Sequence, residues 1–143
     1  MRFAMTMDAA DPAALARFWM VALDYVAAPP PAGWDRWEDW LRDQGVPESE
    51  WGDGATIADP AGSGPSITFL KVPERKTAKN RLHLDLRASG GRAEDAAVRR
   101  SRIRSVVDRL TALGATTLRE HRQGGDLDHV VLGDPEGNEF CVV

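Results

Sequence analysis

A stretch in which charged side chains alternate with leucines is the clearest candidate for acid–base chemistry in this sequence. Over residues 81–87 the charged members are Arg81, His83, Asp85 and Arg87, and the apolar members are Leu82, Leu84 and Leu86. Such alternation predicts a β-strand over residues 81–88 with one charged face and one apolar face. A carboxylate beside an imidazole raises the pKa of the ring and selects its tautomer. His83 and Asp85 could therefore transfer protons or bind a polar ligand group. In an ordinary sheet the same face would simply meet water.

The surrounding pattern predicts two copies of one βαβββ unit. The first copy combines strands over 3–8, 24–28, 54–59 and 65–72 with a helix over 11–23. The second combines strands over 81–88, 115–120, 128–133 and 138–143 with a helix near 96–113. Asp11 followed by Pro12 is typical of a helix start. A D-P-x-G turn between apolar runs occurs in both copies, at Asp59 and at Asp134. This repetition indicates an internal duplication.

Length and composition predict one soluble domain. The chain has 143 residues, of which 43% are hydrophobic, and this is enough for a normal core. Its formal net charge of -4 argues against binding to nucleic acid or to an anionic membrane. We find no signal-like segment and no membrane-spanning segment in the sequence, so a cytoplasmic location is expected. The single cysteine, Cys141, cannot form an internal disulfide, which fits a reducing compartment.

Several segments in this order resemble the vicinal oxygen chelate (VOC) superfamily. They are the helix opening Asp11-Pro12-Ala13-Ala14-Leu15-Ala16-Arg17-Phe18-Trp19, the strand entry Gly114-Ala115-Thr116 and the closing Asp134-Pro135-Glu136-Gly137-Asn138-Glu139-Phe140. More narrowly, Val72-Pro73-Glu74-Arg75-Lys76 with Lys79-Asn80-Arg81-Leu82-His83-Leu84-Asp85-Leu86 is similar to glyoxalase-like domain proteins (glyoxalase/bleomycin resistance/dioxygenase type) common in actinobacteria.

The resemblance implies an α+β fold in which two βαβββ modules form a curved mixed sheet around a cup. The whole chain, 1–143, would be a single glyoxalase-like domain. Module 1 would span about 1–73, with an inserted Trp-rich segment at 29–51, and module 2 would span about 80–143. In this superfamily the helices pack outside the sheets, and the opposite face lines a ligand cup.

The resemblance also implies that no metal is bound. The metal-ligand positions of the family correspond here to Ala4, Thr68, His83 and Cys141, and only His83 is a ligand of the family type. A His-Cys pair falls short of the three protein ligands of a catalytic zinc site. We therefore expect no metal and no other cofactor, and neither glyoxalase I nor extradiol dioxygenase activity.

If the charged face lines the cup, His83 and Asp85 are the candidate catalytic residues. The candidate ligand-binding residues are then these two together with Thr6, Asp8, Thr68, Cys141, Trp34 and Trp37.

The tryptophans belong to the inserted segment. Trp34, Trp37 and Leu41 have helical spacing, which predicts a short amphipathic helix over 34–44. These side chains could roof a pocket for an aromatic or heterocyclic ligand. Alternatively, they anchor the insertion to the core or to a second subunit. We expect a homodimer.

The remaining polar signals favour ordinary surface roles. The run Arg99-Arg100-Ser101-Arg102-Ile103-Arg104 is typical of a solvated helix face. His121 and His129 have no partner that the sequence reveals.

Three functions remain open. The first is a metal-independent protein that binds a small aromatic or heterocyclic metabolite, and the sequence favours this one. The second is a metal-independent isomerase, lyase or dehydratase that uses His83 and Asp85 as an acid–base pair, so enzyme activity stays undecided. The third is a structural or partner-binding module.

Overall fold

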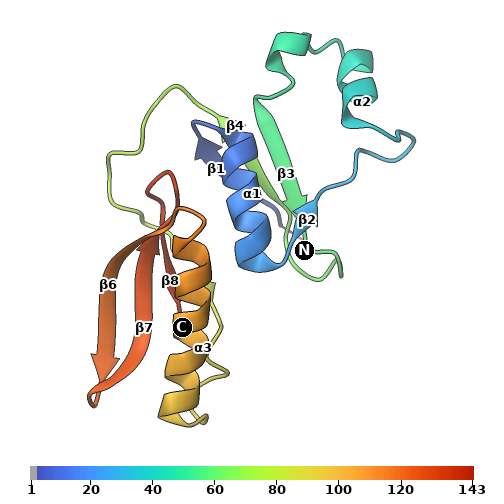
Figure 1. Ribbon diagram of the computed structural model, residues 1–143. Coiled ribbons are helices and arrows are strands. Elements are labelled where there is room, and N and C mark those ends of the chain that lie inside the picture. Colours follow the sequence, from blue (N-terminus) through green and yellow to red (C-terminus); the bar gives the residue numbers. More distant parts are fainter. Residues whose placement is uncertain (1–2) are drawn as a thin grey trace. The chain divides into compact units, whose positions relative to one another are not determined.

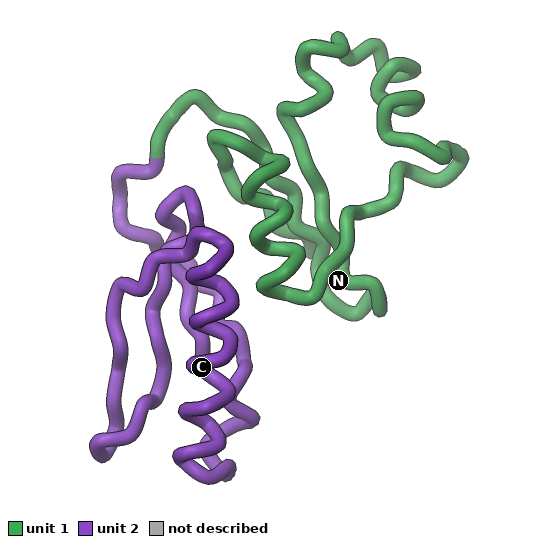
Figure 2. The backbone as a smooth tube through the Cα atoms, viewed as in Figure 1, with its two compact units in different colours: residues 1–75 green, residues 76–143 purple. Residues whose placement is uncertain are grey.

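The chain folds into two compact units, residues 1–75 and residues 76–143, shown in green and purple in Figure 2. A computed structural model describes residues 3–143. Each unit contains one βαβββ module, with a four-stranded mixed sheet and a helix on one of its faces (Figure 1). The predicted α+β class and the two modules are confirmed. No helix within residues 3–143 is both long and apolar enough to cross a membrane.

The first unit has the strand order β1-β4-β3-β2. Its elements are β1 (Met5–Ala9), α1 (Pro12–Leu23), β2 (Val26–Ala27), β3 (Gly54–Ala58) and β4 (Ile67–Lys71). Strands β1 and β4 are parallel, and the other pairs are antiparallel.

Helix α1 begins where the sequence predicts. The Asp11 side chain accepts a hydrogen bond from the Ala14 backbone N–H at 2.9 Å, and Pro12 occupies the first turn. Its apolar stripe packs on β3 and β4, which places Phe18 and Trp19 edge to face in the core of this unit. The fully buried core side chains here include Leu15, Trp19, Ile57, Ile67 and Phe69.

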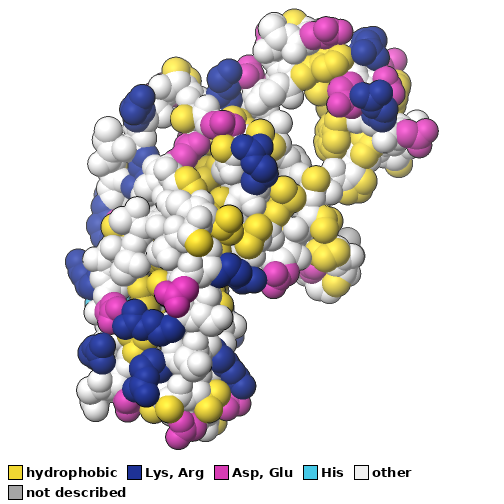
Figure 3. Space-filling model, in the orientation of Figure 1, with side chains coloured by type: hydrophobic (Ala, Val, Ile, Leu, Met, Phe, Trp, Pro, Cys, Tyr) yellow, Lys and Arg dark blue, Asp and Glu magenta, His cyan; other side chains and the backbone are white. Residues whose placement is uncertain are grey.

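The inserted segment forms α2 (Trp37–Asp43) and a 3₁₀ turn, η1 (Glu48–Glu50). The helix begins three residues later than predicted, because Trp34 lies in a turn with its N–H bonded to the Pro31 carbonyl and the backbone is still extended at Arg36. Neither α2 nor η1 contains a buried residue. Hydrophobic side chains remain visible at the surface around α2 (Figure 3).

The second unit repeats the pattern with the strand order β5-β8-β7-β6. Its elements are β5 (Asp85–Leu86), α3 (Ala96–Thr111), β6 (Thr116–Gln123), β7 (Asp126–Gly133) and β8 (Glu139–Val142). Strand β5 is parallel to β8, and the other pairs are antiparallel. Helix α3 is capped by Asp95 and buries Ile103, Val107 and Leu110. The apolar sheet residues in this core include Leu127, Val130, Leu132, Phe140 and Val142.

Strand β5 is shorter than the predicted strand over 81–88. Its register pairs Asp85 with Cys141, so residue 83 falls opposite Glu139, the first residue of β8. Residues 81 and 82 therefore have no strand beside them, and a strand needs a bonded neighbour. Leu82 is 71% exposed as a result, and the prediction of a strand with an apolar face that includes this residue was wrong.

The two D-P-x-G turns share one hydrogen-bond pattern. The buried Asp134 carboxylate accepts from the backbone N–H groups of Glu136 and Asn138. The Asp59 carboxylate accepts from those of Ala61 and Ser63, at the same spacing. Such Asx turns fold the backbone locally, and the repeated pattern supports the duplication.

Candidate functional site

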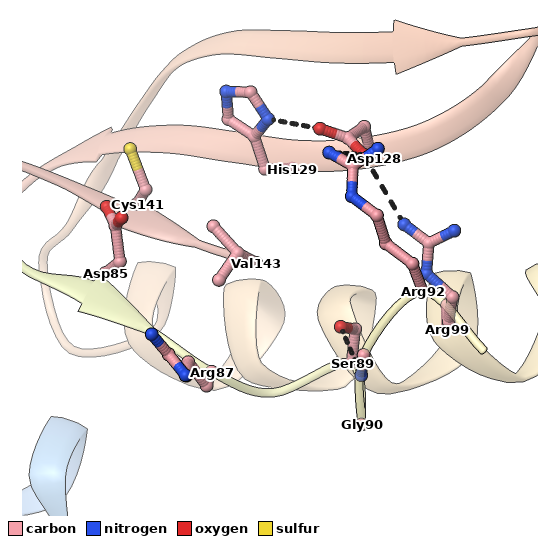
Figure 4. A pocket seen from close by; sticks show the side chains of 11 residues that line it. Asp85, Arg87, Ser89, Gly90, Arg92, Arg99, Asp128, His129, Cys141 and Val143 are labelled. Atoms are coloured by element: carbon pink, nitrogen blue, oxygen red, sulfur yellow. Dashed lines mark hydrogen bonds and ion pairs between the residues drawn. The ribbon is translucent and has the colours of Figure 1, made fainter. Parts of the chain in front are cut away.

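One concave site lies entirely in the second unit, between the sheet and the loop that follows β5. It is a pocket of about 760 Å³ (Figure 4). Its lining comprises Asp85, Arg87, Ser89, Gly90, Gly91, Arg92, Arg99, Asp128, His129, Cys141 and Val143. Val130 and Val142 point toward the core, so their neighbours His129, Cys141 and Val143 point the other way. Figure 4 shows two polar ends with Val143 between them.

One end, which we name the thiol end, consists of Asp85 and Cys141. The parallel register of β5 and β8 makes these two residues direct neighbours. Burial raises the pKa of the Cys141 thiol, and the adjacent Asp85 carboxylate raises it further. The thiol is therefore protonated at neutral pH and is a poor nucleophile.

The other end, which we name the arginine end, is built around Asp128. One carboxylate oxygen, Oδ1, faces two guanidinium groups, at 3.1 Å from Arg92 and 3.5 Å from Arg99. The other oxygen, Oδ2, is hydrogen-bonded at 2.9 Å to Nδ1 of His129. Figure 4 shows the side chains of Arg92, Arg99 and His129 converging on this carboxylate. The hydrogen bond with His129, followed by the charge of Arg92, lowers the pKa of Asp128.

This arrangement defines the tautomer of His129. Asp128 is ionised at neutral pH and can only accept hydrogen bonds, so Nδ1 of His129 must carry the proton. In the neutral ring Nε2 then has a free lone pair, as in a general base. The ring also stacks on His121 of β6, with centroids 4.3 Å apart and planes inclined by 15°. The stack holds the imidazole in one orientation.

The loop after β5 brings Arg92 to the pocket. Gly90 and Gly91 both have φ in the left-handed region, at 85° and 97°. Arg102 donates a hydrogen bond to the Ser89 carbonyl at 3.1 Å, and a Cβ at Gly90 would lie 2.3 Å from its guanidinium. The left-handed backbone therefore favours glycine at position 90, and a larger residue would also displace the end of the Arg102 side chain.

His83 lies near a different carboxylate from the one predicted. Its Nε2 is 3.3 Å from Oε2 of Glu139, which also binds the Lys79 ammonium. That hydrogen bond from Lys79 is the main reason that the pKa of Glu139 is lowered. Within residues 3–143 no hydrogen bond joins His83 to Asp85, and His83 does not line the pocket of about 760 Å³. Asp85 and Cys141 do line it.

The other predicted site residues belong to the first unit. Thr6 and Thr68 are direct neighbours across β1 and β4, and the Thr68 hydroxyl lies 3.1 Å from that of Thr56. This row lies on the sheet face away from α1, because Ile67 and Phe69 occupy the buried face. Asp8 is on the same side of β1 as Thr6 and is exposed.

The two tryptophans are held by bonds within the insertion and its entry. Trp37 donates its indole N–H to the Ala28 carbonyl at 2.9 Å and meets Trp40 edge to face at 5.5 Å. Trp34 lies in the preceding turn. Another pocket of the first unit, about 750 Å³ beside the Asp59 turn, is lined by Ala4 but by no tryptophan. These contacts favour the interpretation in which Trp37 anchors the insertion.

The potential metal donors of residues 3–143 do not gather in a group of three. Among residues 3–143, no three His, Cys, Asp or Glu side chains are close enough to hold one. His83 and Glu139 are two such donors side by side, but Glu139 is already bound by the Lys79 ammonium. A stable site for a transition metal needs at least three protein ligands.

Sequence reasoning missed the arginine end for a local reason. One step along β6, from His121 to Arg122, corresponds to two steps along β7, from His129 to Leu127, so Asp128 is the extra residue of a β-bulge. A bulge breaks the strict alternation of side chains, so Asp128 can bond to its own neighbour. The arginine run contained no such signal, and its interpretation as a solvated face was wrong for Arg99, whose side chain is only 14% exposed whereas that of Arg100 is 49% exposed.

Several solved structures have a fold similar to that of this chain. A glyoxalase/bleomycin resistance/dioxygenase family enzyme from Burkholderia phytofirmans PsJN is similar, with TM-score 0.60, 13% identity, and coverage of 97% of this chain and 94% of that chain. A mutant of the fosfomycin resistance protein FosX from Listeria monocytogenes, complexed with Mn(II) and 1S,2S-dihydroxypropylphosphonic acid, gives TM-score 0.60 and 11% identity over 97% and 85% of the two chains. Lactoylglutathione lyase from Agrobacterium tumefaciens gives TM-score 0.53 and 13% identity over 99% and 91%. At these identities the likeness defines the fold, which is that of the VOC class.

The family follows from the sequence match. The family model described as "Glyoxalase-like domain" matches residues 4–143, and the chain belongs to this glyoxalase-like domain family. A search of curated proteins found no match.

Proposed function

We propose that this glyoxalase-like protein binds a small molecule without a metal, in the pocket of residues 76–143. The pocket itself is the observation that carries the proposal. Its volume of about 760 Å³ lies within the range of about 300–1,000 Å³ that is typical of ligand sites. Its lining is mostly charged and polar, with Val143 as the aliphatic side chain, and two predicted site residues, Asp85 and Cys141, line it.

The shape of the lining favours a flat ligand with polar groups at its ends. Val143 supplies an apolar surface between the thiol end and the arginine end (Figure 4). An aromatic or heterocyclic metabolite presents an apolar body and polar edges, which matches this order.

A thermal-shift screen of aromatic and heterocyclic metabolites tests the proposal. Ligands that bind the folded protein raise its melting temperature. We expect hits that persist in a chelator and that Asp85→Ala weakens, because Asp85 lines the pocket. Asp43→Ala, which removes an exposed carboxylate from α2, is the matched control and should change nothing. If a chelator abolishes the stabilisation by a ligand, binding depends on a metal and that part of the proposal is refuted. If Asp85→Ala leaves the stabilisation unchanged, the ligand does not bind in this pocket.

A second candidate function is an acid–base enzyme, an isomerase, lyase or dehydratase. The sequence suggested His83 and Asp85 for this role. The hydrogen bond between Asp128 and His129 favours the same class, since it leaves Nε2 of His129 able to take a proton. Turnover of a screened ligand, lost in His129→Gln with binding retained, would support the enzyme over the binding protein.

A further inference from the structure

The arginine end contains more positive charge than its own carboxylate neutralises. Oδ1 of Asp128 is shared by Arg92 and Arg99, and Oδ2 is taken by His129. Over the whole lining, three arginines face two aspartates. A lone carboxylate between two guanidinium groups leaves one positive charge without a matched partner.

Arg99 is the least satisfied of these groups. Its side chain is 14% exposed, so water reaches little of it. Its Nε is buried and has no hydrogen-bond partner among the described residues. Its ion pair with Asp128, at 3.5 Å, is the longer of the two. A buried N–H group without an acceptor is unfavourable, so this site is poised to gain from an added acceptor.

The backbone holds both arginines in place. Arg99 extends from the first turns of α3, whose start is capped by Asp95. Arg92 follows the Gly90-Gly91 turn, which Arg102 ties to α3 through the Ser89 carbonyl. A guanidinium presents its donors in a planar fork that matches a carboxylate or a phosphate.

We propose that the arginine end recognises an anionic group of the ligand, a carboxylate or a phosphate, through Arg99 and Arg92. The ligand anion takes over donors that Asp128 only partly occupies, while its apolar body lies along Val143. This inference rests on the proposed function and specifies the class of ligand that the same pocket takes: small aromatic acids or their phosphate analogues.

Titration calorimetry on the full chain with three probes of one shape tests this proposal. The probes are benzoate, phenyl phosphate and the neutral benzamide. We expect at least one anion to bind about tenfold or more tighter than benzamide, and added salt to weaken only the anions. If benzoate binds more tightly than phenyl phosphate, the ligand group is a carboxylate. If phenyl phosphate binds more tightly, it is a phosphate. Both results support the proposal.

Three variants locate the binding. Arg99→Gln keeps a polar side chain and should weaken the anion about tenfold to a hundredfold without changing benzamide. Arg100→Gln, one residue along the helix and exposed, is the control and should bind as the parent does. Asp128→Asn removes the competing carboxylate and should strengthen anion binding, whereas a purely structural Asp128 would leave it unchanged or weaken it.

The outcomes separate this inference from the proposed function. Anions that bind no tighter than benzamide, or that are indifferent to Arg99→Gln, overturn the inference. If benzamide or other neutral compounds still bind and Asp85→Ala weakens them, the small-molecule proposal survives. Binding by none of the three probes at millimolar concentration overturns the inference, and the wider screen then decides the proposed function by itself.

Discussion

At the scale of single residues, the environment of each carboxylate decides its charge. Asp128 is stabilised as an anion by His129, Arg92 and Arg99, which lowers its pKa. Glu139 is stabilised in the same sense, first by Lys79. Burial acts on Cys141 in the opposite direction and keeps the thiol neutral. The pocket thus has an ionised carboxylate, Asp128, at the arginine end and a neutral thiol, Cys141, at the other end.

The lowered pKa of Asp128 makes stability depend on pH. In the unfolded chain an aspartate has a pKa of about 3.9, so just below that pH the unfolded state binds more protons than the folded state. The contribution of Asp128 is therefore present above about pH 4 and is lost as pH falls through its folded pKa. Urea unfolding of the parent and of Asp128→Asn should show the steeper acid loss in the parent. Asp59 and Glu120 also have lowered pKa values, but their contributions to the pH dependence are the same in both proteins and cancel in the comparison. Identical slopes would contradict the assignment.

At the scale of elements, each sheet is stabilised by one helix on one face. In the second unit α3 covers the face that carries Leu132 and Phe140, and both are fully buried. The opposite face keeps His129 and Cys141 free of the helix and available to the pocket. Because side chains alternate between the two faces of the sheet, one face forms the core and the other lines the pocket.

Replacing Leu132 by alanine tests this division. Leu132 is 0% exposed, and its loss should lower the free energy of unfolding by about 2–5 kcal/mol through the cavity left behind. Leu82→Ala is the matched control, because an exposed side chain outside any strand should change stability by no more than about 0.5 kcal/mol. Denaturant titration measures both. Equal effects would mean that the apolar face of this unit is assigned wrongly.

At the scale of the whole molecule, the chain is two modules with one insertion. No residue of α2 is fully buried, although Trp37 and Trp40 belong to this helix and Trp34 lies just before it. These tryptophans are half-buried, and aromatic side chains that keep part of their surface exposed favour contact with another chain. A second copy of this chain is the partner that the sequence leads us to expect.

We therefore predict a homodimer at micromolar concentration. Light scattering should give about twice the 15.7 kDa of one chain. Trp34→Lys places a charge in the proposed contact and should shift the population toward the monomer, because burying an unpaired charge is unfavourable. Arg100→Gln, in the other unit, is the control. A single species of 15.7 kDa across the concentration range would refute the dimer.

Much of the fold follows from local chemistry that the sequence displays. Helix α1 begins at its Asp-Pro signal, and both D-P-x-G turns close through an aspartate bonded to backbone N–H groups. Period-two patterns identified strands in both modules, because alternation reflects a sheet with one buried face. The edges of β5 were harder to predict, since strand length depends on where the neighbouring strand β8 begins.

Only the tertiary structure decided which polar groups meet. His83 was predicted to act with Asp85, two residues away, yet Glu139, 56 positions along the chain, is the carboxylate at 3.3 Å from its ring. Asp128 and His129 are sequence neighbours that a regular strand would point to opposite faces, and a β-bulge lets them bond. Arg99 is one of five arginines on α3, and only packing shows that its Nε is buried. Local rules determine which elements form, whereas contacts across the sheet depend on register, and one residue of register changes every partner.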